Sequence, residues 1–163
     1  MEKKTAQDVL NEFYSNRDPV LPIDVVGIAN SYGIDVLRAS FGGTLKDSVY
    51  GFIEKDGDKT QIVLNANNAL TRRRFTVAHE LGHYFLHHNG KELEYLDMRS
   101  TMSTPEETAA NRFAAELLMP EEQVRREHGK LLFPTVDELA RIFNVSGQSM
   151  RYRLANLKLD AFG

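Results

Sequence analysis

Residues 72–88 read RRRFTVAHELGHYFLHH and contain four of the five histidines in the chain. Within this segment, His79-Glu80-Leu81-Gly82-His83 has the spacing HExxH. Residues four apart share one face of an α-helix, so His79 and His83 can reach a single ion, while Glu80, rotated by about 100°, lies beside an open coordination position. The spacing predicts a helix over residues 71–88 that holds a metal ion on one face.

A second interpretation of these histidines is the polar edge of an ordinary packed helix, because HExxH also arises by chance. Helical structure itself is favoured by apolar residues at helical spacing, namely Phe75, Val77, Ala78, Leu81, Tyr84 and Phe85. Gly82 costs about 1 kcal/mol relative to alanine, which is tolerable where another backbone packs close to the metal. His87 lies about 12 Å along the axis from His79, too far to bind the same ion. We expect His87 and His88 to be cations at the helix C-terminus and His128 to lie on the surface.

Two histidines leave a catalytic zinc short of a ligand, since such sites commonly have three protein ligands and a water. Glu106, Glu107 and Glu116 all lie in the next predicted helix, residues 105–119. Glu107 and Asn111 are one turn apart, so Glu107 can bind the metal while Asn111 hydrogen-bonds a ligand histidine. The alternative is a capping box, in which Glu107 folds back on the amide of Thr104. Both interpretations of Glu107 stay open on spacing alone.

The rest of the chain predicts an α+β domain. Helical spacing is present in residues 5–14 and 23–33, and helix 105–119 is stopped by Pro120. Residues 34–37, 48–54 and 60–65 are short, β-branched and aromatic, and KDGDK at 55–59 indicates a hairpin turn. We therefore expect a small antiparallel sheet between two groups of helices, with a polar connection over 89–103.

The C-terminal residues 131–163 resemble a helix-turn-helix packed on a domain formed by residues 1–130. Ala140 lies in the first predicted helix and Met150 in the second. Asn144 suits a left-handed turn residue, and Ser146 suits a helix start. Arg151 and Arg153 are candidates for DNA contact, but packing or substrate docking also fits such a helical pair.

Composition restricts the chemistry. The 163 residues include 42% hydrophobic and 26% charged residues with a net charge of −3, so there is no basic excess for general nucleic-acid binding. The absence of cysteine restricts metal ligands to His, Asp and Glu. Because no long apolar run or signal segment is present, we expect a cytoplasmic protein without membrane contact; its oligomeric state is not predicted.

The chain resembles the ImmA/IrrE family of zinc metallopeptidases. The resemblance rests on RRRFTVAHELGHYFLHH and ETAANRFAAELLMP, and more weakly on PIDVVGIANSYGIDV and TVDELARIFNVSGQSMRYRLANLKL. It implies a gluzincin-like zincin fold with Zn²⁺ held by His79, His83 and Glu107, and Glu80 as the catalytic base. Many relatives have a second glutamate where this chain has Ala109. Because Glu107 is retained four residues before Asn111, zinc binding is still expected.

The resemblance also implies a function: a zinc endopeptidase that cleaves a helix-turn-helix repressor encoded in a mobile element, prophage or stress-response locus. Tyr95, a nearby histidine and a backbone amide are all candidates to stabilise the oxyanion. Residues 48–54 are a candidate strand for pairing with an extended substrate at a sheet edge, and the alternative is that the edge of this strand is simply covered by the protein. The alternative function is an anti-repressor, or a DNA- or protein-binding module, that acts without hydrolysis and has a structural metal.

Overall fold

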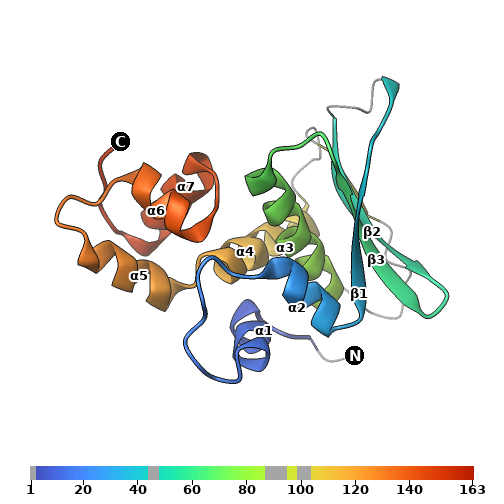
Figure 1. Ribbon diagram of the computed structural model, residues 1–163, viewed down its shortest axis with the longest axis horizontal. Coiled ribbons are helices and arrows are strands. Elements are labelled where there is room, and N and C mark those ends of the chain that lie inside the picture. The colour runs from blue at the N-terminus through green and yellow to red at the C-terminus, as the bar shows by residue number, and fades with distance from the viewer. Residues whose placement is uncertain (1–2, 44–47, 87–94, 99–103) are drawn as a thin grey trace.

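The computed structural model describes residues 3–43, 48–86, 95–98 and 104–163, with the backbone alone described for 95–98. Figure 1 shows the arrangement of helices and strands in these ranges. The helices are α1 (Ala6–Phe13), α2 (Val25–Ser31), α3 (Leu70–Leu86), α4 (Pro105–Leu118), α5 (Glu121–Lys130), α6 (Val136–Phe143) and α7 (Gly147–Leu157). The chain is an α+β protein, as its sequence predicts.

The strands β1 (Ile34–Ala39), β2 (Val49–Asp56), β3 (Lys59–Asn65) and β4 (Tyr95–Met98) form a mixed sheet in the order β1-β3-β2-β4. The predicted hairpin joins β2 and β3, with Asp56 opposite Lys59 and Gly57 in the left-handed region at φ 62°. The prediction of an antiparallel sheet is wrong for β1, which runs parallel to β3. Two chain reversals separate these strands, so they point the same way. Periodicity reveals strands, but it does not reveal the order of neighbours.

Strand β4 lies inside the segment 89–103 that was predicted to be a polar connection. It pairs antiparallel with β2, and β3 pairs with the other side of β2. Gly51 to Ile53 of β2 therefore lie between two neighbouring strands, so the hypothesis that residues 48–54 form a free edge for a substrate is wrong and the alternative of a covered edge is confirmed. A four-residue strand has too few alternating positions to be recognised from periodicity.

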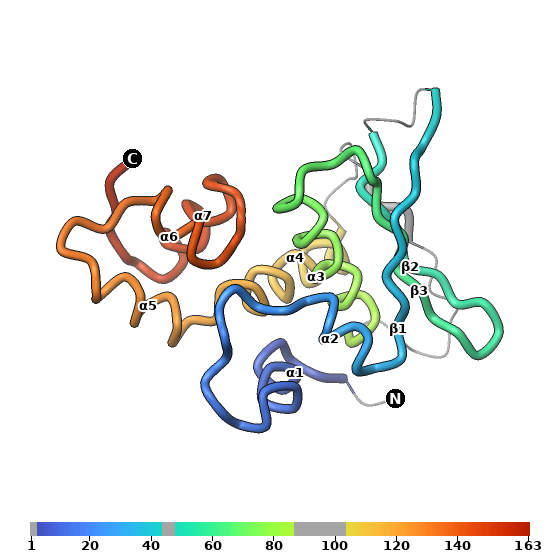
Figure 2. Tube along the Cα trace, viewed as in Figure 1, coloured from blue at the N-terminus to red at the C-terminus, as the bar shows by residue number. Residues whose placement is uncertain are grey.

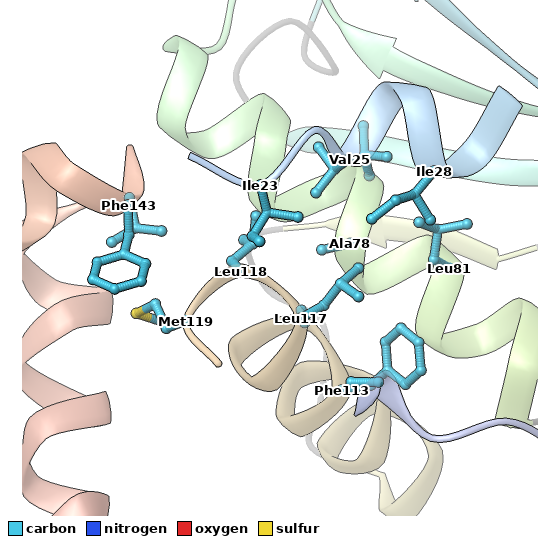
Figure 3. Close-up of a cluster of buried hydrophobic side chains, with 14 of the residues drawn as sticks. Ile23, Val25, Ile28, Ala78, Leu81, Phe113, Leu117, Leu118, Met119 and Phe143 are labelled. Atoms are coloured by element: carbon cyan, nitrogen blue, oxygen red, sulfur yellow. The ribbon is translucent and has the colours of Figure 1, made fainter. Parts of the chain in front are cut away.

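Helices α3 and α4 cross at the centre of the molecule, with the sheet on one side and α5, α6 and α7 on the other (Figures 1 and 2). Figure 3 shows the side chains that fill the centre: Ile23, Val25 and Ile28 near α2 pack towards Ala78 and Leu81 of α3 and Leu117 of α4. Each of these six side chains is at most 1% exposed. Because burying such a side chain stabilises the fold by about 1.5–3 kcal/mol, this cluster fixes α3 against α4.

The apolar cluster continues into the C-terminal helices. Met119, directly after α4, and Phe143 of α6 are both buried and face each other in Figure 3. The predicted turn between α6 and α7 is confirmed at two residues. Asn144 has the left-handed dihedral angles φ 52° and ψ 53°, and the Ser146 hydroxyl accepts a hydrogen bond from the amide of Ser149 at 3.1 Å.

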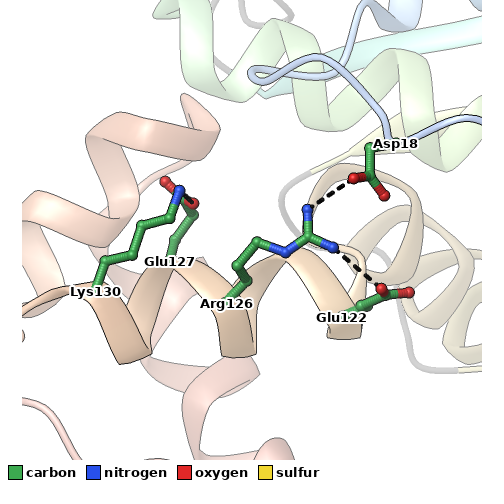
Figure 4. A network of polar contacts seen from close by, with 5 residues as sticks. All are labelled: Asp18, Glu122, Arg126, Glu127 and Lys130. Atoms are coloured by element: carbon green, nitrogen blue, oxygen red, sulfur yellow. Dashed lines mark hydrogen bonds and ion pairs between the residues drawn. The ribbon is translucent and has the colours of Figure 1, made fainter.

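The sequence pattern does not predict helix α5, because Pro120 marks the end of the preceding helix. Proline also suits a helix start, since its missing N–H is not needed there, and Glu121 and Glu122 favour the first turn of α5. On its surface, Arg126 bonds Asp18 and Glu122 at 3.1 Å each (Figure 4). All three side chains are well exposed, so this network adds little stability.

Two arginines connect the C-terminal helices to the central pair. Arg74 of α3 donates to the carbonyl oxygens of Asn144 and Phe143 at 3.1 and 3.3 Å, and Arg153 of α7 donates to that of Met119 at 2.9 Å. Burial lowers the pKa of both guanidinium groups. The Arg74 bonds hold the turn of the helical pair against α3, and the Arg153 bond holds α7 against the end of α4. No helix in the described ranges is long and apolar enough to cross a membrane.

Candidate metal centre

Helix α3 carries the HExxH residues in its buried middle portion. Its buried polar residues are Thr76, His79, Glu80 and His83. The predicted helix over 71–88 is thus present as Leu70–Leu86, while His87 and His88 lie outside the described residues. Four buried polar side chains in one helix are costly unless they have partners, so their contacts decide what the helix does.

The two imidazoles and the carboxylate of Glu107 converge. The Nε2 atoms of His79 and His83 are 3.1 Å apart. Glu107 of α4 places one carboxylate oxygen 2.9 Å from Nε2 of His79 and the other 3.0 Å from Nε2 of His83. One ligand atom from each residue can be chosen so that all three lie within 4.8 Å of one another. Two histidines one turn apart on α3 and a glutamate from α4 therefore direct their ligand atoms to one point.

This donor set fits a divalent ion. Tetrahedral zinc with bonds of about 2.0–2.1 Å has ligand atoms roughly 3.3 Å apart, slightly more than the spacings observed here. Two imidazole nitrogens and one carboxylate are also a ligand set typical of catalytic zinc, which keeps its fourth position for water. A shift of a few tenths of an ångström would open the cluster around an ion.

Asn111 determines which nitrogen of His79 faces the cluster. Its Oδ1 lies 2.8 Å from Nδ1 of His79. An amide oxygen only accepts hydrogen bonds, so Nδ1 carries the proton and donates it to Asn111. The lone pair of His79 is then on Nε2, the atom directed at His83 and Glu107. A bond of this kind orients a metal-binding imidazole.

The structure contains one half of the capping box that was the alternative interpretation of Glu107. The hydroxyl of Thr104 accepts a hydrogen bond from the backbone amide of Glu107 at 3.1 Å, so Thr104 does cap α4. The Glu107 carboxylate itself contacts His79 and His83. The backbone and the side chain of one residue thus serve two purposes, which spacing alone does not reveal.

Gly82 allows the close approach of α3 and α4. A Cβ atom at Gly82 would lie 3.0 Å from both the Cα and the carbonyl oxygen of Ala110 and 3.2 Å from Cβ of Phe113. Two of these atoms belong to the backbone, which does not give way easily. The expectation that another backbone packs against this glycine is confirmed, and the approach brings Glu107 within reach of the histidines.

Glu80 is the residue of the site whose buried carboxylate has no described hydrogen-bond partner. It is 0% exposed, and neither carboxylate oxygen has a hydrogen-bond partner among the residues that the structure describes. An ionised carboxylate in such surroundings costs several kcal/mol unless something pairs with it. Its position next to His79 on α3 makes a water or a substrate group at the metal the partner that fits.

The other candidate residues are elsewhere. Glu106 is exposed at the start of α4, Glu116 is half-buried towards its end, and the imidazole of His128 contacts the carbonyl oxygen of Asp160 at 2.6 Å. The side chain of Tyr95, a candidate for the oxyanion, lies outside the described residues. None of Glu106, Glu116 and His128 is in the described cluster of possible metal ligands.

A comparison with protein families identifies this arrangement. The family model described as the IrrE N-terminal-like domain, a peptidase family, matches residues 29–155. The chain belongs to the ImmA/IrrE family of metallopeptidases. The matched range includes the whole of α3 and α4, and with them every residue of the cluster described above.

Two relatives are similar to this ImmA/IrrE chain over part of its length. Metallopeptidase ImmA of Bacillus subtilis (strain 168) is 26% identical over 107 residues, which cover 66% of this chain and 63% of that protein. Uncharacterized immunity region protein 2 of Bacillus phage phi105 is 36% identical over 78 residues, covering 47% of this chain and 49% of the phage protein. In both cases, less than two thirds of the relative's length is matched.

Proposed function

We propose that the protein is a zinc-dependent endopeptidase that cleaves a helix-turn-helix repressor in the cytoplasm. The observation that carries the proposal is the convergence of His79, His83 and Glu107 beside the buried carboxylate of Glu80, which lacks a described partner. Membership of the ImmA/IrrE family supports hydrolysis of peptide bonds. The names of the two relatives, a metallopeptidase and an immunity region protein, agree with a regulatory substrate.

In this proposal His79, His83 and Glu107 hold the zinc. When bound, zinc supplies Lewis acidity, which polarises the peptide carbonyl and lowers the pKa of a water molecule towards about 7. Asn111 keeps the His79 ring in the orientation and protonation state that the site needs. The close contact of Gly82 with Ala110 fixes the separation of the histidines from Glu107.

Glu80 is assigned the proton transfers. Its carboxylate takes the proton from the attacking water and passes it to the nitrogen of the leaving amine. A base of this kind works best when its ionised form is not strongly bound by other groups, and neither oxygen of Glu80 has a hydrogen-bond donor in the described part of the chain. General bases of this type contribute about 10²–10⁴-fold to the rate.

Co-expression with a candidate helix-turn-helix repressor tests the proposal. With the wild-type protein we expect a shortened repressor, whose cleavage site mass spectrometry identifies. With Glu80→Gln we expect an intact repressor, although the purified variant still contains zinc by elemental analysis. Relief of repression by Glu80→Gln with the repressor intact would instead support the anti-repressor alternative. A protein purified without zinc, or a Glu80→Gln variant that cleaves normally, would contradict the mechanism.

A further inference from the structure

Arg72, two turns before His79 on α3, has a guanidinium group held between aromatic rings. Its Cζ atom lies 4.1 Å from the ring centroid of Tyr50 and 4.8 Å from that of Phe75. The Nε atom is buried without a hydrogen-bond partner, and no carboxylate pairs with this group in residues 3–43, 48–86 and 104–163. Arg72 is half-buried, and its terminal nitrogens are not among the fully buried unpaired atoms, so part of the guanidinium reaches the surface.

The sheet has an irregularity that accounts for this position of Tyr50. The register of β2 against β4 shifts between Val49 and Gly51, so Tyr50 is an extra residue at a bulge. Gly51 faces α3, because a Cβ atom there would meet the Thr76 side chain at 2.9 Å. In a regular strand Tyr50 would point to the opposite face. The bulge redirects its ring to Arg72, and bulges are common beside active sites for this reason.

The neighbouring Arg74 shows what a purely structural arginine looks like in this helix. Its guanidinium donates to two carbonyl oxygens of α6 and its turn, Phe143 and Asn144. Among the residues that the structure describes, Arg72 has no such acceptor. Its rings restrict the side chain and exclude water from one part of it, while part of the guanidinium reaches the surface. A guanidinium prepared in this way binds a carboxylate with little loss of conformational freedom.

The distance from the metal cluster suits a substrate contact. Arg72 and His79 are seven residues apart and lie on nearly the same face of α3, about 10.5 Å apart along the axis. An extended peptide rises about 3.3 Å per residue, so this distance corresponds to about three residues of substrate.

We propose that Arg72 determines specificity by binding the side chain of an aspartate or glutamate about three residues from the bond that is cleaved. The inference rests on the proposed function. It assigns to the substrate an acidic residue at a defined distance from the cleavage site, and to Tyr50 and Phe75 the positioning of the guanidinium. The charge-assisted, bidentate geometry of arginine with a carboxylate supplies the selectivity.

Selection of peptides tests the inference without requiring hydrolysis. Zinc-loaded Glu80→Gln protein is used to select binders from displayed random dodecapeptides. We expect enrichment of Asp and Glu at one position. For a selected peptide and its Asn or Gln counterpart, fluorescence anisotropy measures the ratio of dissociation constants, which we expect to be about tenfold in favour of the acid.

Three further variants in the Glu80→Gln background identify the residue responsible. Arg72→Gln should bring the ratio close to one, and Arg72→Lys should retain part of it, because lysine keeps the charge without the planar fork. Arg141→Gln, which removes an exposed arginine on α6, should leave it unchanged. A purely structural Arg72 would weaken the binding of both peptides equally, and circular dichroism checks that each variant is folded.

The outcomes separate this inference from the proposed function. Absence of acidic enrichment, or enrichment that survives Arg72→Gln, overturns the role of Arg72. If acidic peptides bind through Arg72 but the wild-type enzyme with zinc does not cleave them, the role of Arg72 stands and the proposed endopeptidase activity fails. If wild-type enzyme cleaves acidic and neutral peptides with the same kcat/KM, the activity stands and the specificity role fails.

Discussion

The C-terminal helices and the helix that carries HExxH begin in opposite ways. In α6 and α7, Thr135 and Ser146 each accept a hydrogen bond from the amide three residues later, and α6 has Asp137 and Glu138 in its first turn. Helix α3 has no acidic residue in its first turn and carries arginines at its third, fourth and fifth positions. Positive charge opposes the helix dipole at this end.

The two regions also differ in how many polar side chains they bury. Among described residues, α5, α6 and α7 bury only two polar side chains, Gln123 and Arg153, and Arg153 has a backbone acceptor. Helix α3 alone buries Thr76, His79, Glu80 and His83, and it has a glycine in its middle. Local rules are followed where a segment has only to fold, and their violation in α3 coincides with the proposed chemistry.

The largest effect is expected from removing the acidic partner of the histidines. Glu107→Gln should weaken zinc binding by at least about 100-fold, because even the loss of a residue that merely orients a ligand costs about 10–100-fold. Glu106→Gln, one position earlier and exposed, is the matched control and should bind zinc normally. Competition with a fluorescent chelator measures both affinities. Equal affinities for the two variants would remove Glu107 from the site.

Replacing one glycine by alanine in each region should change the free energy of unfolding in opposite directions. Gly82→Ala places a Cβ atom 3.0 Å from the backbone of Ala110 and should lower the free energy of unfolding by about 1–3 kcal/mol. Gly129→Ala in α5 meets nothing within 4 Å and should raise it by up to about 1 kcal/mol. Urea denaturation measures the difference. A stabilised Gly82→Ala protein would mean that the two helices separate easily.

The sequence predicts much of both regions, for different reasons. In α3, the fixed spacing of His79 and His83 is enough to bring them onto one face. In the turn after α6, Asn144 and Ser146 are residue types with strong local preferences, so their conformations follow from identity alone. Both kinds of signal act over a few residues, and both elements are present in the structure.

Interactions between segments that are distant in the sequence are harder to predict from the sequence. Glu107 had two plausible partners, and only the packing of α4 on α3 brings it 2.9–3.0 Å from the imidazoles. The parallel pairing of β1, the strand β4 and the bulge at Tyr50 depend on which strands are neighbours. Arg72 belongs to a run of three arginines that is visible in the sequence. What distinguishes Arg72 from Arg74 is the set of groups that each guanidinium contacts in the folded protein, and the sequence does not show these contacts.

The contact between the two regions should be weaker than the packing around Gly82. Arg153→Met keeps most of the buried aliphatic stem but removes the donor to the Met119 carbonyl, and should lower the free energy of unfolding by about 1–2 kcal/mol. Arg151→Met is the matched control. Arg151 is exposed and bonds only the carbonyl of Gly163 in the described chain, so its loss should cost less than about 0.5 kcal/mol. Equal losses would show that the buried hydrogen bond from Arg153 contributes no more stability than the exposed one from Arg151.

The smallest effect tests whether the C-terminal helices depend on their caps. Ser146→Ala removes the acceptor for the amide of Ser149 at the start of α7, and should cost about 1 kcal/mol. Ser149→Ala removes only a hydroxyl contact with Ser146 and leaves the capped amide intact, so it should cost less than about 0.5 kcal/mol. Thermal unfolding followed by circular dichroism measures both. Zinc affinity should be the same in the two variants, because α7 contributes no residue to the cluster on α3 and α4. A change in zinc affinity with Ser146→Ala would show instead that the ordering of α7 is transmitted to α3 through Arg74, and the two regions would then have to be treated as one coupled unit.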